Sequence, residues 1–161
     1  MKTGKRRIVL IALDYDPTAQ KVAEKGYSMA KAMNAEVILL HVISAPLYYS
    51  SVGNAPIMGL TDSMGVDPLL YENMDRLKTV SQNFLDNSKK HLGDKTIQTL
   101  LEEGDFAESI LRVAKELDVD VIVVGSHSRK WLEYIVMGSV TEMVLNHTEI
   151  PLFIIPIKKH N

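Results

Sequence analysis

The chain has 161 residues, the length of one domain with enough apolar sequence to bury a core. Its 46% hydrophobic and 24% charged residues are typical of a globular protein, and a formal net charge of -2 offers no basic surface for nucleic acid. Because the chain has no cysteine, disulfides, thiolate metal sites and cysteine nucleophiles are excluded.

Five segments are predicted to be strands. In chain order they are residues 8–13, 36–43, 96–102, 119–124 and 152–157. All except 96–102 are almost continuously apolar, which is typical of parallel strands buried on both faces. The first run is too short for a signal peptide or a membrane span, so we expect a cytoplasmic protein with no membrane contact.

Two longer helices are predicted before the third strand. Asp16 is a candidate N-cap with Pro17 at the first helical position, and Asn34 ends that helix. The second helix is expected over residues 70–92. The residues expected on its inward face are Met74, Leu77, Val80, Phe84 and Leu85.

Two further helices are predicted from their capping signals. Asp105 and Glu108 form a pattern similar to a capping box and open the third helix. Its expected inward residues are Phe106, Ile110, Leu111, Ala114 and Leu117. Ser139 and Glu142 match the capping box itself, and we expect them to open a short helix that ends near His147.

This alternation of strands and helices predicts one α/β domain over residues 1–161. It is expected to be an open parallel sheet, Rossmann-like, with right-handed crossovers and helices on both faces. Residues 44–68 have no clear period, and we interpret them as an insertion after the second strand.

A ligand is expected where strands end, at the point where the winding of such a sheet reverses. Asp14 follows the first strand, and residues 125–129 follow the fourth. Gly138 and Ser139 open the fourth helix, whose amino end favours anions, and Arg129 would add positive charge. The alternative is that Asp14 serves a turn or cap, Gly138 a turn, and Ser139 only an N-cap.

The spacing of Gly125, Ser128, Gly138 and Ser139 resembles the nucleotide motif of universal stress proteins. That motif reads glycine, two residues, glycine, nine residues, glycine, then serine or threonine. The Leu-Leu-His-Val of the second strand and the Ile-Pro-Leu-Phe-Ile-Ile-Pro near the end are also similar to that family. Ser128 replaces the second glycine: it either hinders the close approach of a phosphate or donates its hydroxyl to one.

The resemblance implies five parallel strands in the order 3-2-1-4-5. It also implies an adenine nucleotide, ATP or AMP, with Mg²⁺ as a candidate companion of ATP. Asp14 would contact the ribose and the backbone of Val42 the adenine. The residues that would surround ribose and phosphates are Gly125, Ser126, Ser128, Arg129, Gly138, Ser139, Val140 and Thr141. Family members commonly form homodimers through the last strand, here residues 152–157.

Enzymatic readings find little support in the sequence. There is no Gly-x-Ser-x-Gly elbow of a serine hydrolase and no P-loop. A receiver domain would need an aspartate at the end of its third strand, where this chain has Glu102-Glu103-Gly104. A flavodoxin would need a hydroxyl-rich phosphate loop after its first strand, and Leu13-Asp14-Tyr15-Asp16-Pro17 is not such a loop. The histidines lack metal-ligand spacing. Together with the resemblance, this implies a nucleotide-binding stress or signalling protein, not a dedicated enzyme, whose protein partner the sequence does not identify. The alternative is a dimeric scaffold of the same fold that binds no nucleotide.

Overall fold

The computed structural model describes residues 4–15, 17–43, 68–126 and 139–157, with side chains in the third segment described from Asn73 onward. The strands are β1 (Ile8–Ala12), β2 (Glu36–Ile43), β3 (Gln98–Glu103), β4 (Val121–Gly125) and β5 (Leu152–Ile155). The helices are α1 (Ala19–Ala32), α3 (Pro68–Leu92), α4 (Phe106–Glu116) and α5 (Ser139–His147). The expected insertion, apart from Pro68, lies outside the described residues.

All strand pairs are parallel, and the strand order is β3-β2-β1-β4-β5, which confirms the expected architecture. β1 is central and pairs with β2 on one side and β4 on the other. The winding therefore reverses between β1 and β4.

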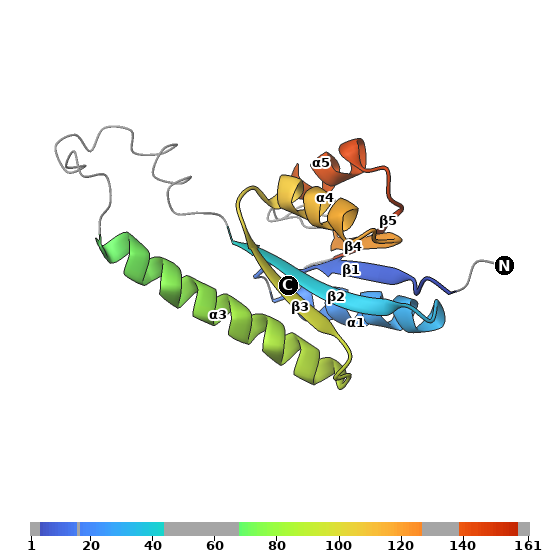
Figure 1. The fold of residues 1–161 in the computed structure, drawn as a ribbon, viewed down its shortest axis with the longest axis horizontal. Helices are drawn as coiled ribbons and strands as arrows, with labels where there is room; N and C mark the ends of the chain where they lie inside the picture. The colour runs from blue at the N-terminus through green and yellow to red at the C-terminus, as the bar shows by residue number, and fades with distance from the viewer. Residues whose placement is uncertain (1–3, 16, 44–67, 127–138, 158–161) are drawn as a thin grey trace.

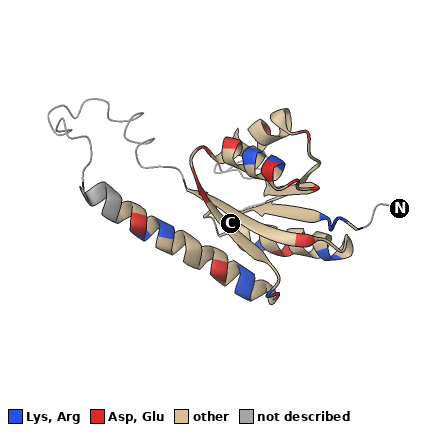
Figure 2. Ribbon diagram, in the orientation of Figure 1, with Lys and Arg blue, Asp and Glu red and all other residues tan. Residues whose placement is uncertain are grey.

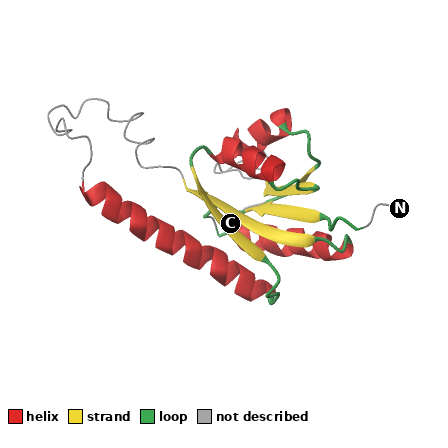
Figure 3. Ribbon diagram, viewed as in Figure 1, coloured by secondary structure: helices red, strands yellow, loops and turns green. Residues whose placement is uncertain are grey.

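A hydrophobic core lies on each face of the sheet. Val9 and Ile11 of β1 belong to the core beneath α1 and α3, whereas Leu10 between them belongs to the core beneath α4 and α5. Figures 1 and 3 show these two helix pairs on opposite sides of the sheet. Because side chains alternate along a strand, a strand covered on both faces is apolar at every position.

The first helix begins two residues later than the sequence predicted. Residues 17 and 18 form a turn, and the Thr18 carbonyl accepts the first helical hydrogen bonds from Lys21 and Val22 at 3.0 and 3.3 Å. Thr18 is therefore the N-cap residue, without a side-chain cap bond, and the predicted Asp16 cap is wrong. Asp16 itself is outside the described residues. Asn34 ends the helix as expected, with a positive φ of 54°.

The buried face of α3 agrees with the prediction only in part: Leu85 is buried and Phe84 packs against the core, but two other expected residues do neither. Leu77 and Val80 are 40% and 46% exposed, whereas Ser81, Leu85 and Ser88 are buried. Positions 81, 85 and 88 form a narrow stripe against the sheet, because α3 covers only the part of it near β2 and β3. The Ser88 hydroxyl donates to the Phe84 carbonyl at 2.9 Å, so its burial leaves no unmet donor.

The α4 cap is confirmed, since the Asp105 carboxylate accepts from the Glu108 N–H at 2.9 Å. Leu117, which was expected to point inward, is 39% exposed. It is the C-cap residue, one position beyond the last helical turn, so the periodicity of the helix no longer fixes its direction. None of the helices in the described part of the chain has the length and apolar composition to cross a bilayer.

Candidate functional site

The carboxyl ends of β1, β2 and β4 lie side by side and carry several of the predicted site residues. The register pairs Ile11 with Val123 and Ala12 with Leu40. Asp14 follows β1, Val42 lies near the end of β2, and Gly125 ends β4. Parallel strands thus bring these three positions to one edge of the sheet.

Gly125 is required by packing. A Cβ added there would lie 2.5 Å from Cδ1 of Ile157 and 2.9 Å from Cγ2 of Val22. Both side chains are buried. The glycine lets α1 and the segment after β5 approach the end of β4, a role that the motif spacing did not reveal.

Ser126 connects the end of β4 to the end of β5. Its N–H donates to the Ile155 carbonyl, and its Oγ accepts from the Ile157 N–H, both at 2.9 Å. The side chain is 3% exposed. Ser126 therefore supports the floor of this edge, and its contact with a ligand stays a prediction.

Thr141 joins the amino end of α5 to the end of β4. Its Oγ1 donates to the Gly125 carbonyl at 2.9 Å, and the residue is 3% exposed. Ser139, the first helical residue, is exposed, while Val140 packs against the core beneath α4 and α5. The Thr141 bond holds the first turn of α5 beside the end of β4, and the helix dipole favours an anion at this amino end.

The residues around Asp14 are held by β2 and α3. The Leu13 N–H donates to the Leu40 carbonyl at 2.8 Å, and the Leu13 carbonyl lies 2.7 Å from Nδ1 of His41. Asp14 is half-buried and Tyr15 exposed. No role for His41 was predicted from the sequence, where the signal that could have found it is a histidine inside an apolar strand.

Three predicted site residues, Ser128, Arg129 and Gly138, lie outside the described residues. α5 begins at Ser139 itself, so Ser139 occupies the first helical position and not the N-cap position that the expected capping box requires. Among the residues that the structure describes, no group of three or more His, Asp or Glu side chains is arranged to hold a metal ion.

The acidic carboxyl end of β3 is neutralised by basic side chains. Lys78 of α3 lies 2.7 Å from Glu103, and Arg112 of α4 lies 3.1 Å from Glu102. The hydrogen bonds with these carboxylates raise the pKa of Lys78 and of Arg112. Figure 2 shows the acidic end of β3 with α3 and α4 on either side. The pairing limits the repulsion that this end would exert on a nearby anion.

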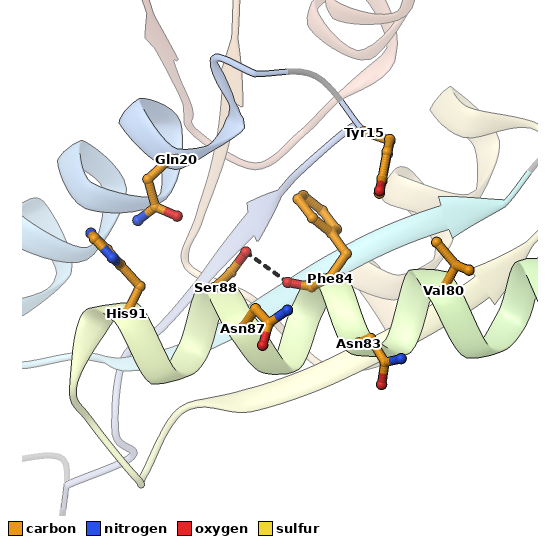
Figure 4. A pocket seen from close by; sticks show the side chains of 8 residues that line it. All are labelled: Tyr15, Gln20, Val80, Asn83, Phe84, Asn87, Ser88 and His91. Carbon is orange, nitrogen blue, oxygen red and sulfur yellow. Dashed lines mark hydrogen bonds between the residues drawn. The ribbon is translucent and has the colours of Figure 1, made fainter.

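A separate hollow of about 450 Å³ lies between α1 and α3 and opens to solvent. Figure 4 shows Gln20 on α1 and Tyr15 above Phe84 of α3. The described residues that line it are Tyr15, Gln20, Val80, Asn83, Phe84, Asn87, Ser88 and His91. The Gln20 Nε2 is buried without a hydrogen-bond partner in the described part of the protein. None of the predicted site residues that the structure describes lines this hollow.

Comparisons with known proteins agree with the fold. Residues 5–156 match the sequence model of the universal stress protein family. A universal stress protein of Methanocaldococcus jannaschii is 30% identical over 154 residues, covering 93% of this chain and 94% of that protein. The structure of universal stress protein UspA from Lactobacillus plantarum has a TM-score of 0.75 at 18% identity, covering 95% of this chain and 99% of that one. A universal stress protein solved in complex with cAMP has a TM-score of 0.57 at 16% identity, with 94% and 98% covered.

Proposed function

The chain belongs to the universal stress protein family, and on that premise we propose that it binds an adenine nucleotide, ATP or AMP, across the carboxyl ends of β1 and β4. The observation that carries the proposal is the hydrogen bond from Thr141 to the Gly125 carbonyl. It holds the amino end of α5 at the strand edge that also bears Asp14. The amino end of α5, which favours an anion, and the Asp14 carboxylate, which suits ribose hydroxyls, would then share one site at this edge.

Each group has a distinct part in this proposal. The Asp14 carboxylate accepts from the ribose hydroxyls, and the Val42 backbone recognises the adenine. The first turn of α5 from Ser139 receives the phosphates, together with Ser128, Arg129 and Gly138. Mg²⁺ would accompany ATP by screening its phosphate charges.

The cAMP complex of a universal stress protein supports an adenine nucleotide as the class of ligand for this fold. That protein is only 16% identical to this chain, so it supports the class and not the particular nucleotide. The chain has neither the Gly-x-Ser-x-Gly elbow of a serine hydrolase nor a P-loop, which favours binding over catalysis. We accordingly propose a cytoplasmic nucleotide-binding stress or signalling protein and not a dedicated enzyme.

A second candidate is a dimeric scaffold that acts without nucleotide. It is favoured by β5, an edge strand whose Phe153 is 41% exposed and whose four residues carry no charge. An apolar edge strand of this kind is suited to pairing with a second copy of the chain. Dimerisation through β5 is compatible with both candidates, and only ligand binding separates them.

Calorimetric titration with ATP and AMP, with and without Mg²⁺, tests the proposal. The wild-type protein is expected to bind at micromolar concentration, and Asp14→Asn to bind about tenfold or more weakly, since hydrogen bonds to a charged group are worth about 1.5–3 kcal/mol. The matched control is Asp86→Asn on the exposed side of α3, which should bind as the wild type does. No binding by the folded wild type at millimolar nucleotide would leave the scaffold as the function.

A further inference from the structure

His41 is a buried side chain in the strand that leads to Val42, and it is 7% exposed. Its Nδ1 lies 2.7 Å from the Leu13 carbonyl oxygen. Because a carbonyl oxygen only accepts hydrogen bonds, Nδ1 carries a hydrogen and donates it to Leu13.

This side-chain bond lies where the sheet ladder between β1 and β2 ends. The Leu13 N–H donates to the Leu40 carbonyl. In a regular parallel ladder the next bond would run from the Val42 N–H to the Leu13 carbonyl. β1 ends at Ala12, however, and His41 supplies the donor for Leu13. Both polar groups of Leu13 are thus held by β2, one residue before Asp14.

The residue after Asp14 is held from another element. The rings of Tyr15 and Phe84 have centroids 5.2 Å apart, and Phe84 meets the His41 ring edge-on at 5.5 Å. Figure 4 shows the Tyr15 and Phe84 side chains facing each other. His41 and Phe84 therefore fix the chain on either side of Asp14.

We propose that His41 is a positioning residue of the nucleotide site, an inference that rests on the proposed function. It fixes the backbone before Asp14, so that the carboxylate meets the ribose without first being ordered.

Three substitutions of His41 distinguish the contribution of its Nδ1–H donor from the contribution of the ring itself. His41→Asn places an amide N–H where Nδ1 stands, His41→Gln places one near Nε2 instead, and His41→Leu removes both. In calorimetric titrations with ATP, His41→Leu and His41→Gln are expected to bind about fivefold to tenfold more weakly, the range of one lost hydrogen bond, whereas His41→Asn stays within about twofold.

The control is His147→Leu. Nδ1 of His147 also contacts a carbonyl, that of Met143 at 2.9 Å, but it is exposed at the far end of α5. This variant should bind as the wild type does. Thermal unfolding checks that every variant is folded.

A double-mutant cycle tests whether His41 acts through Asp14. In an Asp14→Asn background the additional loss caused by His41→Leu should shrink to about twofold or less, because coupled residues are not additive. Without nucleotide, amide hydrogen exchange at residues 13–15 should be faster in His41→Leu and restored in His41→Asn.

The outcomes distinguish the two proposals. If the wild type binds ATP and His41→Leu binds equally well, the role of His41 is refuted and the proposed function stands. Fully additive losses, or failure of His41→Asn to restore binding, also refute it. If the wild type binds no nucleotide, the proposed function fails and this inference with it.

Discussion

Asp94, in the turn between α3 and β3, ties that turn to α1. Its carboxylate accepts from the Thr96 hydroxyl at 2.6 Å and the Thr96 N–H at 2.8 Å, and from the Tyr27 hydroxyl at 2.8 Å. These bonds, with those of Thr96 foremost, hold the pKa of Asp94 at about 2. Burial of the phenol and its bond to Asp94 raise the pKa of Tyr27.

The lowered pKa of Asp94 predicts that its contribution to the stability of the fold is lost in acid. A carboxyl with a lowered folded-state pKa contributes stability that is complete above its ordinary value of 3.8 and is lost as the pH falls through about 2. The free energy of unfolding of Asp94→Asn should therefore lie below that of the wild type at neutral pH, and the difference should shrink between about pH 4 and pH 2. Urea titrations across this range measure it. A difference that does not change with pH would contradict the assignment.

Ser139 allows the phosphate end of the proposed site to be tested separately. Ser139→Asp places a carboxylate in the first turn of α5, where it stabilises the helix by about 0.3–1 kcal/mol. The same charge would repel phosphates, and a repulsion of about 1.4 kcal/mol weakens binding tenfold. ATP affinity should fall about tenfold or more and adenosine affinity much less. Ser139→Ala, which adds no charge, is the control. If Ser139→Asp weakened the binding of ATP and of adenosine equally, the phosphates would have to lie elsewhere.

At the scale of elements, α1 lies close to the sheet because Gly26 has no side chain. A Cβ there would lie 2.9 Å from Cδ1 and 3.1 Å from Cγ1 of Ile11, and 3.1 Å from Cγ1 of Val123. Ile11 and Val123 are fully buried in the core, so displacing either side chain costs free energy.

Gly26→Ala therefore sets a gain in helix propensity of about 1 kcal/mol against an overpacking cost of about 1–3 kcal/mol. We expect a net destabilisation of about 1 kcal/mol in chemical denaturation. Ser28→Ala, an exposed position on the same helix, should be neutral or slightly stabilising. A Gly26→Ala protein more stable than the wild type would show that α1 can move away from the sheet.

The elements were predictable where one local signal decides them. Almost continuously apolar runs located four of the strands, the more amphipathic run at 96–102 located β3, and Asp105 marked the start of α4. Periodicity alone did not select the buried stripe of α3, because Leu77 and Val80 repeat as regularly as Leu85 and only packing against the sheet separates them. The start of α1 was misjudged because Asp16-Pro17 is a good initiation signal that the turn at residues 17 and 18 overrides.

At the scale of the whole molecule, the edge of the sheet that carries the site followed from chain order. The carboxyl ends of parallel strands lie at one edge of the sheet, and so the sequence alone was enough to place Asp14 and Gly125 there. The contacts of Ser126 with Ile157 and of His41 with Leu13 join residues 31 and 28 positions apart. No local pattern encodes such pairs, so the supports of the site could not be predicted.

The two edges of the sheet differ in charge, and this difference indicates which edge is suited to pairing in a dimer. The β3 edge carries Glu102 and Glu103 in ion pairs, whereas the β5 edge is uncharged and exposes Phe153. Light scattering should show a dimer for the wild type and a monomer for Phe153→Lys, because a buried lysine at a paired edge is costly. Gln98→Lys on the exposed surface of β3 is the matched control and should stay dimeric. A monomeric wild type would refute the β5 interface.

The measurement that tests the central claim most directly is a nuclear magnetic resonance titration of the ¹⁵N-labelled protein with ATP. Amide signals of Asp14, Val42 and Ser126 and of the first turn of α5 should shift and saturate together. Signals of Asn83 and Asn87, in the hollow between α1 and α3, should stay in place. Saturable shifts confined to that hollow, or none at millimolar ATP, would contradict a nucleotide site at the ends of β1 and β4.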